Sequence, residues 1–137
     1  IAVCAPSSTE ASLDDILNIV AEAKTGEIGP LMTKLKAQGT QPVGLCIGAT
    51  RHFRTLYAAA SDPAGAASGI SRLRPPVFGP RRDRMIRQAG AWGAGKLEVA
   101  LTMLTDTDLQ LRSASQNAPE MELVERTLIR LSMLAQR

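Results

Sequence analysis

Aromatic residues are scarce in this chain of 137 residues, of which they make up 3%: Phe53, Tyr57, Phe78 and Trp92. β-Sandwiches and β-barrels draw heavily on aromatic and β-branched side chains, so this composition disfavours them. It also leaves few rings on which nucleic-acid bases could stack. The chain is built instead with alanine, leucine, arginine, methionine and glutamine, which favour helices.

Long apolar runs and ligands for metals are scarce as well. No apolar run reaches the roughly 18 residues of a membrane span, and no basic-then-apolar leader is present, so we expect a cytoplasmic protein without a membrane segment. Cys4 and Cys46 have small apolar neighbours, which predicts two reduced, semi-buried thiols. With His52 they make only three candidate ligands, whereas a zinc site needs about four, so no metal is expected.

The sequence contains no pattern typical of a self-contained active site. The segment Gly90–Lys96 comes nearest to a phosphate-binding loop, but Leu97 stands where such a loop has serine or threonine. His52 is the one histidine that could serve as a general base, and arginines flank it. Asp14 and Asp15 are adjacent, so on a helix their side chains point about 100° apart. We therefore expect no cofactor and no catalytic residue.

The positive charge is concentrated in the middle of the chain. The net charge of the whole is +3, but residues 51–96 carry nine lysines and arginines against two acids, while both flanking segments are slightly acidic. Six arginines crowd one short stretch: Arg72, Arg74, Arg81, Arg82, Arg84 and Arg87. Such a cluster can face nucleic-acid phosphates, an acidic protein partner or only water, and the sequence leaves these three interpretations open.

The spacing of apolar residues predicts helices over 13–24, 28–38 and 43–60. Ser12 is the expected N-cap of the first and Thr40 that of the third, with Pro42 in its first turn; Gly39 is the expected stop after the second. The third helix is apolar nearly all round at its start, which predicts a place at the centre of the bundle. Its glycines, Gly44 and Gly48, suggest close packing of helices.

The second half of the chain predicts further helices over 81–92, 95–113 and 119–136. Several prolines and glycines interrupt 62–80, where one or two helical turns are expected over 66–73. Pro80 opens one of these helices, and Gly93 and Gly95 separate it from the next. No segment has a defensible strand pattern. The predicted fold is therefore all-α, a bundle of five to six helices.

Two regions resemble the delta subunit of bacterial DNA polymerase III, a clamp-loader subunit. The segment Gln41–Leu56, QPVGLCIGATRHFRTL, is similar to that family's pattern E-P-x-x-I-L-x-x-L-x-R-x-F-R-x-L. Leu73–Phe78, LRPPVF, followed by Arg81, is similar to L-R-P-P-V-F-x-K-R-K, and a Q-x-x-x-W pattern and an L-x-x-A-L-x-x-L pattern follow in the same order. The resemblance extends over about residues 10–134.

The resemblance implies a collar domain of all-α fold, which joins the equivalent domains of the gamma/tau and delta-prime subunits in a pentameric ring that loads the sliding clamp onto DNA. In this family the delta subunit does not hydrolyse ATP, and its N-terminal part contacts the clamp. Because the chain begins at Ile1 rather than methionine, we expect a fragment of such a subunit. Residues 1–11 would be the tail of a preceding segment, and 12–137 the collar domain.

The arginines are the expected contacts to partner subunits or, indirectly or weakly, to DNA. This prediction covers the central helix and the arginine-rich stretch: Arg51, Arg54, Arg72, Arg74, Arg81, Arg82, Arg84 and Arg87. The alternative is an independent helical nucleic-acid-binding module that uses the arginine-rich stretch 72–87. Against this alternative, the sequence shows no convincing helix-turn-helix and few aromatic residues for stacking.

Overall fold

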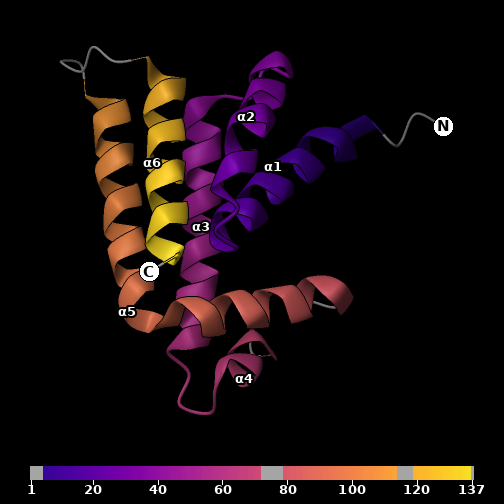
Figure 1. Ribbon diagram of the computed structural model, residues 1–137, viewed down its shortest axis with the longest axis vertical. Helices are drawn as coiled ribbons and strands as arrows, with labels where there is room; N and C mark the ends of the chain where they lie inside the picture. Colours follow the sequence, from indigo (N-terminus) through magenta and orange to yellow (C-terminus); the bar gives the residue numbers. More distant parts are fainter. Residues whose placement is uncertain (1–4, 72–78, 114–118, 137) are drawn as a thin grey trace.

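The computed structural model of the protein describes residues 5–71, 79–113 and 119–136. Within these ranges the chain is an all-α bundle without strands, which confirms the predicted fold class. The described residues form six α-helices, arranged as in Figure 1, and a short 3₁₀ turn, η2, precedes the second. The helices are α1 (Ala5–Ala21), α2 (Ile28–Ala37), α3 (Pro42–Ala60), α4 (Ala66–Ser71), α5 (Gly79–Arg112) and α6 (Glu120–Ala135); η2 spans Thr25–Glu27.

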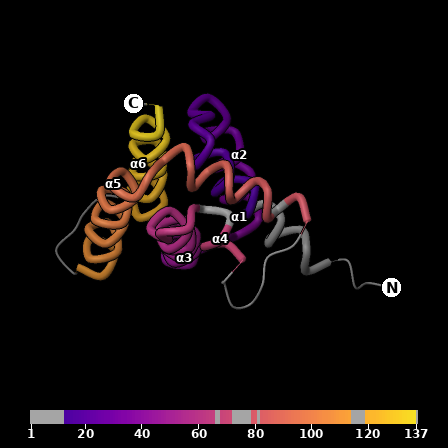
Figure 2. Tube along the Cα trace, turned by 90° about the horizontal axis from the view of Figure 1, so that it is seen from below, coloured from indigo at the N-terminus to yellow at the C-terminus, as the bar shows by residue number. Residues whose placement is uncertain are grey.

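Helix α3 has several helix neighbours, but the predicted central place holds only for its inner side, because its outer side is exposed. It packs against α1, α4, α5 and α6. The second half of α5 and all of α6 run alongside it, whereas the first half of α5 lies across its lower end (Figure 1). Seen from below, this first half runs beneath α1 (Figure 2). The arginine-rich part of the chain therefore enters the bundle on an arm that crosses the other helices.

The first helix differs from its prediction at both ends. It begins at Ala5, so Ser12 lies inside α1 and is not its N-cap. It ends at Ala21 rather than at residue 24, because the chain turns sharply there. Ala23 adopts a left-handed backbone conformation with φ 63°, and the Lys24 amide donates to the Ile19 carbonyl at 3.0 Å. This closure is a Schellman motif that satisfies carbonyls of the last helical turn.

The end of α2 matches its prediction. Gly39 follows the helix with φ 80°, and the Thr40 amide donates to the Leu35 carbonyl at 3.1 Å. A glycine takes this left-handed position without steric cost. The prediction of Thr40 as the cap of α3 is wrong by one residue. Gln41 is the N-cap, and Pro42 occupies the first turn as expected, because its missing N–H would have no partner there anyway.

The sequence predicted that the apolar residues at the start of α3 would be buried, but two of them are exposed. Val43 is 37% exposed and Ile47 is 43% exposed, whereas Leu45, Cys46 and Phe53 are buried. The expected close packing at the two α3 glycines is also absent within the described part of the chain. A Cβ added at Gly44 or at Gly48 would meet nothing within 4 Å. One side of α3 therefore remains uncovered along its first half.

The glycine that does permit close helix packing is Gly69 in α4. A Cβ built there would lie 2.5 Å from the Ala59 Cα and 2.8 Å from the Ala59 carbonyl oxygen. We expected this residue to be one of the glycines that interrupt helix formation over 62–80. It lies instead inside α4, where it lets the backbones of α3 and α4 approach each other. The predicted turns over 66–73 are confirmed for Ala66–Ser71; residues 72 and 73 lie outside the described part.

The predicted separation near residue 93 exists as a sharp bend in α5. Gly93 has φ 77° and ψ 156°, which is not helical, and it divides α5 into an arm (79–92) and a rod (94–112). The buried apolar residues of arm and rod follow helical spacing, and they are Met85, Ala89, Trp92, Leu97, Ala100, Leu104 and Leu111. The last helix begins at Glu120, so Pro119 is its N-cap rather than its first residue.

Candidate functional site

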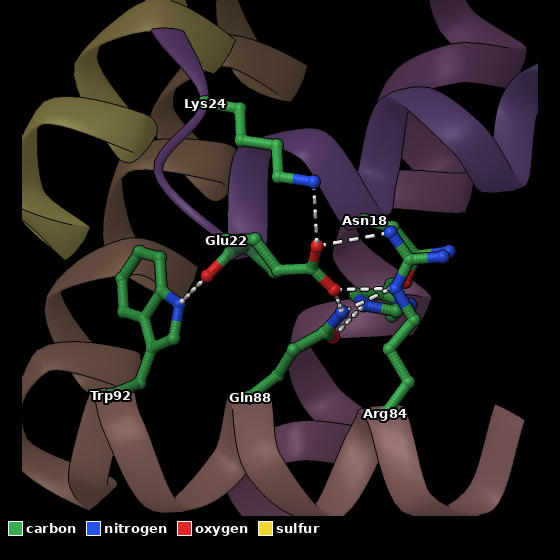
Figure 3. Close-up of polar contacts among 8 residues, drawn as sticks. Asn18, Glu22, Lys24, Arg84, Gln88 and Trp92 are labelled. Atoms are coloured by element: carbon green, nitrogen blue, oxygen red, sulfur yellow. Dashed lines mark hydrogen bonds and ion pairs between the residues drawn. The ribbon is translucent and has the colours of Figure 1, made fainter. Parts of the chain in front are cut away.

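The most extensive polar contacts in the described part link α1 to the arm of α5. Glu22 in the turn after α1 receives two hydrogen bonds from Arg84 (Figure 3), one from Nε to Oε2 and one from Nη2 to Oε1 at 2.9 Å. This side-by-side arrangement is the strong bidentate form of an arginine–carboxylate pair. The two residues are 62 positions apart, so the pair fixes the arm to a distant part of the chain.

Gln88 extends the contacts to a third helix. Its amide nitrogen donates to Asn18 Oδ1 at 2.8 Å and to Glu22 Oε2 at 2.9 Å. Its amide oxygen therefore faces the other way, where it lies 2.9 Å from His52 Nε2 on α3. Because this oxygen can only accept, the His52 ring donates from Nε2. Gln88 is 2% exposed and joins α1, α3 and α5 at one point.

Trp92 lies one helical turn after Gln88 and belongs to the same cluster. We call this cluster the joint, and it consists of Asn18, Glu22, His52, Arg84, Gln88 and Trp92. Its indole nitrogen donates to the Ala21 carbonyl at 2.8 Å, which gives a carbonyl at the end of α1 the partner that its own helix cannot supply. Its ring meets Phe53 of α3 edge to face, with centroids 5.1 Å apart and an interplanar angle of 73°. The arm is thus held to α1 by hydrogen bonds and to α3 by an aromatic contact.

The charges of the joint reinforce one another. The hydrogen bond from Arg84, followed by that from Gln88, outweighs burial and lowers the pKa of Glu22 from 4.5 to about 2. The same bond raises the pKa of Arg84. Lys24 adds a weaker attraction, with its Nζ 3.6 Å from Glu22 Oε1. Glu22 therefore stays ionised at neutral pH, and its charge is already matched by protein cations.

An open pocket of about 610 Å³ lies beside this joint. Its lining includes Glu22, Arg84, Arg87, Trp92 and, from α6, Ala135. The groups that could react, a carboxylate and a guanidinium, are hydrogen-bonded to each other. No cluster of three or more possible metal ligands occurs among the described residues. The hydrogen bonds beside this pocket hold α1, α3 and the arm of α5 together.

The structure scatters the predicted contact arginines rather than gathering them. Arg84 lies in the joint. Arg82 is half-buried and donates to Ser71 at 3.2 Å, and Arg87 is exposed at the pocket rim. Arg81 belongs to α5, but its side chain lies outside the described part, as do the residues Arg72 and Arg74.

Arg51 and Arg54 lie on the uncovered side of α3. With Val43, Gly44 and Ile47 they form what we call the outer face of α3, where all five residues are exposed and follow helical spacing. Within the described part of the chain, neither arginine has an ion pair or a side-chain hydrogen bond. The apolar residues occupy the first half of this face and the arginines the second. This face is the better candidate for a contact with another molecule.

Sequence reasoning missed the residues of the joint on α1. Glu22 and Asn18 have no pattern that would distinguish them from ordinary surface polar residues of a helix. The one sequence feature that pointed to this cluster was the pair Gln88 and Trp92, which are four positions apart and form the Q-x-x-x-W pattern of the resemblance. This spacing places both side chains on one face, and both contact the end of α1.

Comparison of the chain with family models, curated proteins and solved structures finds no match. Among the described helices, none combines the length and the apolar character needed to cross a membrane.

Proposed function

We propose that this chain is an assembly domain of the collar type, which helps the delta subunit of a bacterial replicative clamp loader to join gamma/tau and delta-prime. In this role the chain binds protein neighbours and performs no chemistry, and the sliding clamp is contacted only by other parts of the subunit. The proposal combines the ordered resemblance in the sequence with an all-α bundle that carries an uncovered face.

One contact in particular supports this proposal. Phe53 belongs to the segment that resembles the R-x-F-R motif, and Trp92 belongs to the one that resembles Q-x-x-x-W. In the structure the two rings meet edge to face in the core. Two separately recognised segments therefore depend on each other for packing, as expected if they belong together in one domain.

The distribution of exposed apolar residues also supports a role in assembly. Besides Val43 and Ile47, three large apolar side chains of the described residues are about half exposed or more: Val99 (49%), Leu109 (61%) and Met133 (51%). They lie on the rod of α5 and on α6. Single exposed apolar residues are common, but several of them on neighbouring helices suit a domain that has neighbours on more than one side.

An independent nucleic-acid-binding module is the alternative. The exposed Arg51, Arg54 and Arg87, which have no ion pair among the described residues, favour it. Arg84, however, has its guanidinium engaged by Glu22, and Trp92 is buried in the core. A titration with a DNA junction at several salt concentrations distinguishes the two functions. Tight binding by the chain alone, with a steep loss of affinity as salt rises, would favour the nucleic-acid module over the assembly domain.

The direct test is reconstitution. The chain is mixed with full-length gamma/tau and delta-prime subunits, and the mixture is separated by gel filtration. We expect the chain to elute with these subunits and the chain alone to show no ATP hydrolysis. Elution of the chain at its own position, with no shift in the presence of either subunit, would contradict the proposal.

A further inference from the structure

The outer face of α3 presents an apolar half and a cationic half in line. Val43 and Ile47 are four positions apart, and Arg51 and Arg54 continue the same side of the helix toward its C-terminal end. The opposite side of α3 is the core, with Leu45, Ala49, Phe53 and Leu56 fully or almost fully buried. In Figure 2, where α3 is seen nearly end-on, it lies at the edge of the bundle. One side of the central helix is therefore accessible.

Unlike Arg84 and Arg112, the two arginines of this face have no acidic partner among the described residues. Arg84 pairs with Glu22, and Arg112 pairs with Asp108 at 3.2 Å. Arg51 and Arg54 have no comparable contact. A partner that places carboxylates at this end of the face would supply the missing charge.

Gly44 of this face and the neighbouring Gly48 have no packing role inside the described part of the chain. Space for at least one more carbon atom is open around Gly44 and Gly48. A glycine in a helix interior costs about 1 kcal/mol relative to alanine, and what it offers in return is a close approach of another backbone. Together with Val43 and Ile47, this makes the first half of the face suitable for a helix that brings small and aliphatic side chains.

We propose that the outer face of α3 binds one amphipathic helix of a partner protein, with an apolar seam against Val43, Gly44 and Ile47 and with acidic side chains against Arg51 and Arg54. The inference rests on the proposed assembly function and names the chemistry of its partner. A nucleic acid fits less well, because phosphates would leave the apolar half exposed and only two arginines would face them.

The first arm of the test uses a designed probe. The probe is a helical peptide with an alanine–leucine seam in one half and three glutamates in one turn of the other half. It is titrated into the isotope-labelled chain, and amide chemical shifts are followed. We expect shifts centred on the outer face of α3, and about tenfold weaker binding by a matched peptide with glutamine in place of glutamate.

Equal affinity for the two peptides, shifts centred on another surface, or no binding of either peptide would overturn the proposal. The double variant R51E/R54E should lose the preference for the glutamate peptide. Its matched control is R126E/R130E on α6, where both arginines are also exposed but line a pocket that contains Asp106. The control should keep the preference, and near-identical circular dichroism spectra would show that both variants are folded.

The second arm separates this inference from the proposed function. The same two double variants are mixed with gamma/tau and delta-prime subunits. If the wild-type chain joins the complex and only R51E/R54E is lost from it, both proposals are supported. Retention of R51E/R54E as tightly as wild type would leave the assembly function standing and overturn the α3 face as its contact. If wild type does not join, the assembly function fails, and the peptide arm alone decides the docking face.

Discussion

Arg84 holds both carboxylate oxygens of Glu22, with its Nη2 2.9 Å from Oε1 and its Nε bonded to Oε2. This contact attaches the arm of α5 to the turn that ends α1, and Gln88 and Trp92 strengthen it from the same face of the arm. The arm carries four of the arginines that the sequence had marked as possible contacts. A few polar residues therefore fix the arm to the end of α1, in addition to its apolar contacts with the core.

Replacing Glu22 with glutamine should destabilise the protein by about 1–2 kcal/mol at neutral pH, less than its lowered pKa alone would indicate, because Arg84 is 38% exposed and water screens the pair. The folded-state pKa of about 2 lies below the ordinary 4.5, so this stability is present above pH 4.5 and is lost as the pH falls toward 2. Urea unfolding of both proteins at a series of pH values measures the difference.

The matched control for Glu22→Gln is Asp108→Asn, which removes one partner of the exposed Asp108–Arg112 pair. We expect a loss below about 0.5 kcal/mol, because exposed pairs within a helix contribute little. If Glu22→Gln costs no more than the control, or if the difference between wild type and Glu22→Gln persists unchanged to low pH, the joint does not depend on this charge.

Replacing Ala23 with glycine should stabilise the protein by about 0.5–1 kcal/mol. Ala23 has φ 63°, a conformation that glycine adopts freely and alanine only at a cost. The control is Ala58→Gly on the exposed side of α3, where the same change should destabilise by about 1 kcal/mol. Thermal unfolding followed by circular dichroism compares the two, and a loss of stability in Ala23→Gly would argue against the turn described at the end of α1.

Replacing Gly69 with alanine should cost about 1–3 kcal/mol, because the new methyl group would overlap the Ala59 backbone. Gly95→Ala is the control, since its Cβ meets nothing within 4 Å and the change should be neutral or slightly stabilising. Chemical denaturation of the two variants tests this directly. Similar stability of both would mean that α4 does not pack against α3 as closely as the structure shows.

Replacing Gly93 with alanine should destabilise the protein by about 1–3 kcal/mol, since φ 77° with ψ 156° is a conformation that other residues rarely adopt. Gly90→Ala, in the helical arm and in open space, should instead gain about 0.5–1 kcal/mol. Trp92, the single tryptophan, reports on the bend by fluorescence. A gain of stability in both variants would indicate that α5 is one continuous helix.

The helices and most core positions could be predicted from sequence because apolar spacing and a few strong signals determine them. Gly39 marks the end of α2, and Trp92 and Leu97 lie where the periodicity places them. The start of α1 was wrong because Ser12 has the chemistry of a cap and the helix nevertheless continues to Ala5. Local propensity is weak, and it does not decide whether a helix gains another two turns.

The candidate site was harder to predict, because it depends on partners that are far apart in the sequence. Arg84 was one of six similar arginines in a short stretch, and nothing local distinguishes the one that meets Glu22. The exposure of Val43 and Ile47 was missed for a related reason. An apolar residue on a helix predicts burial, but which side of the helix its own chain leaves uncovered depends on the packing of other helices.

If the chain is an assembly domain, as we propose, it adds its own mass to the reconstituted complex. Light scattering is measured on gamma/tau and delta-prime eluting from gel filtration, with and without the chain. We expect a complex that is heavier by one copy of this chain, both at low salt and at physiological salt. An unchanged mass, with the chain eluting separately under both conditions, would contradict it.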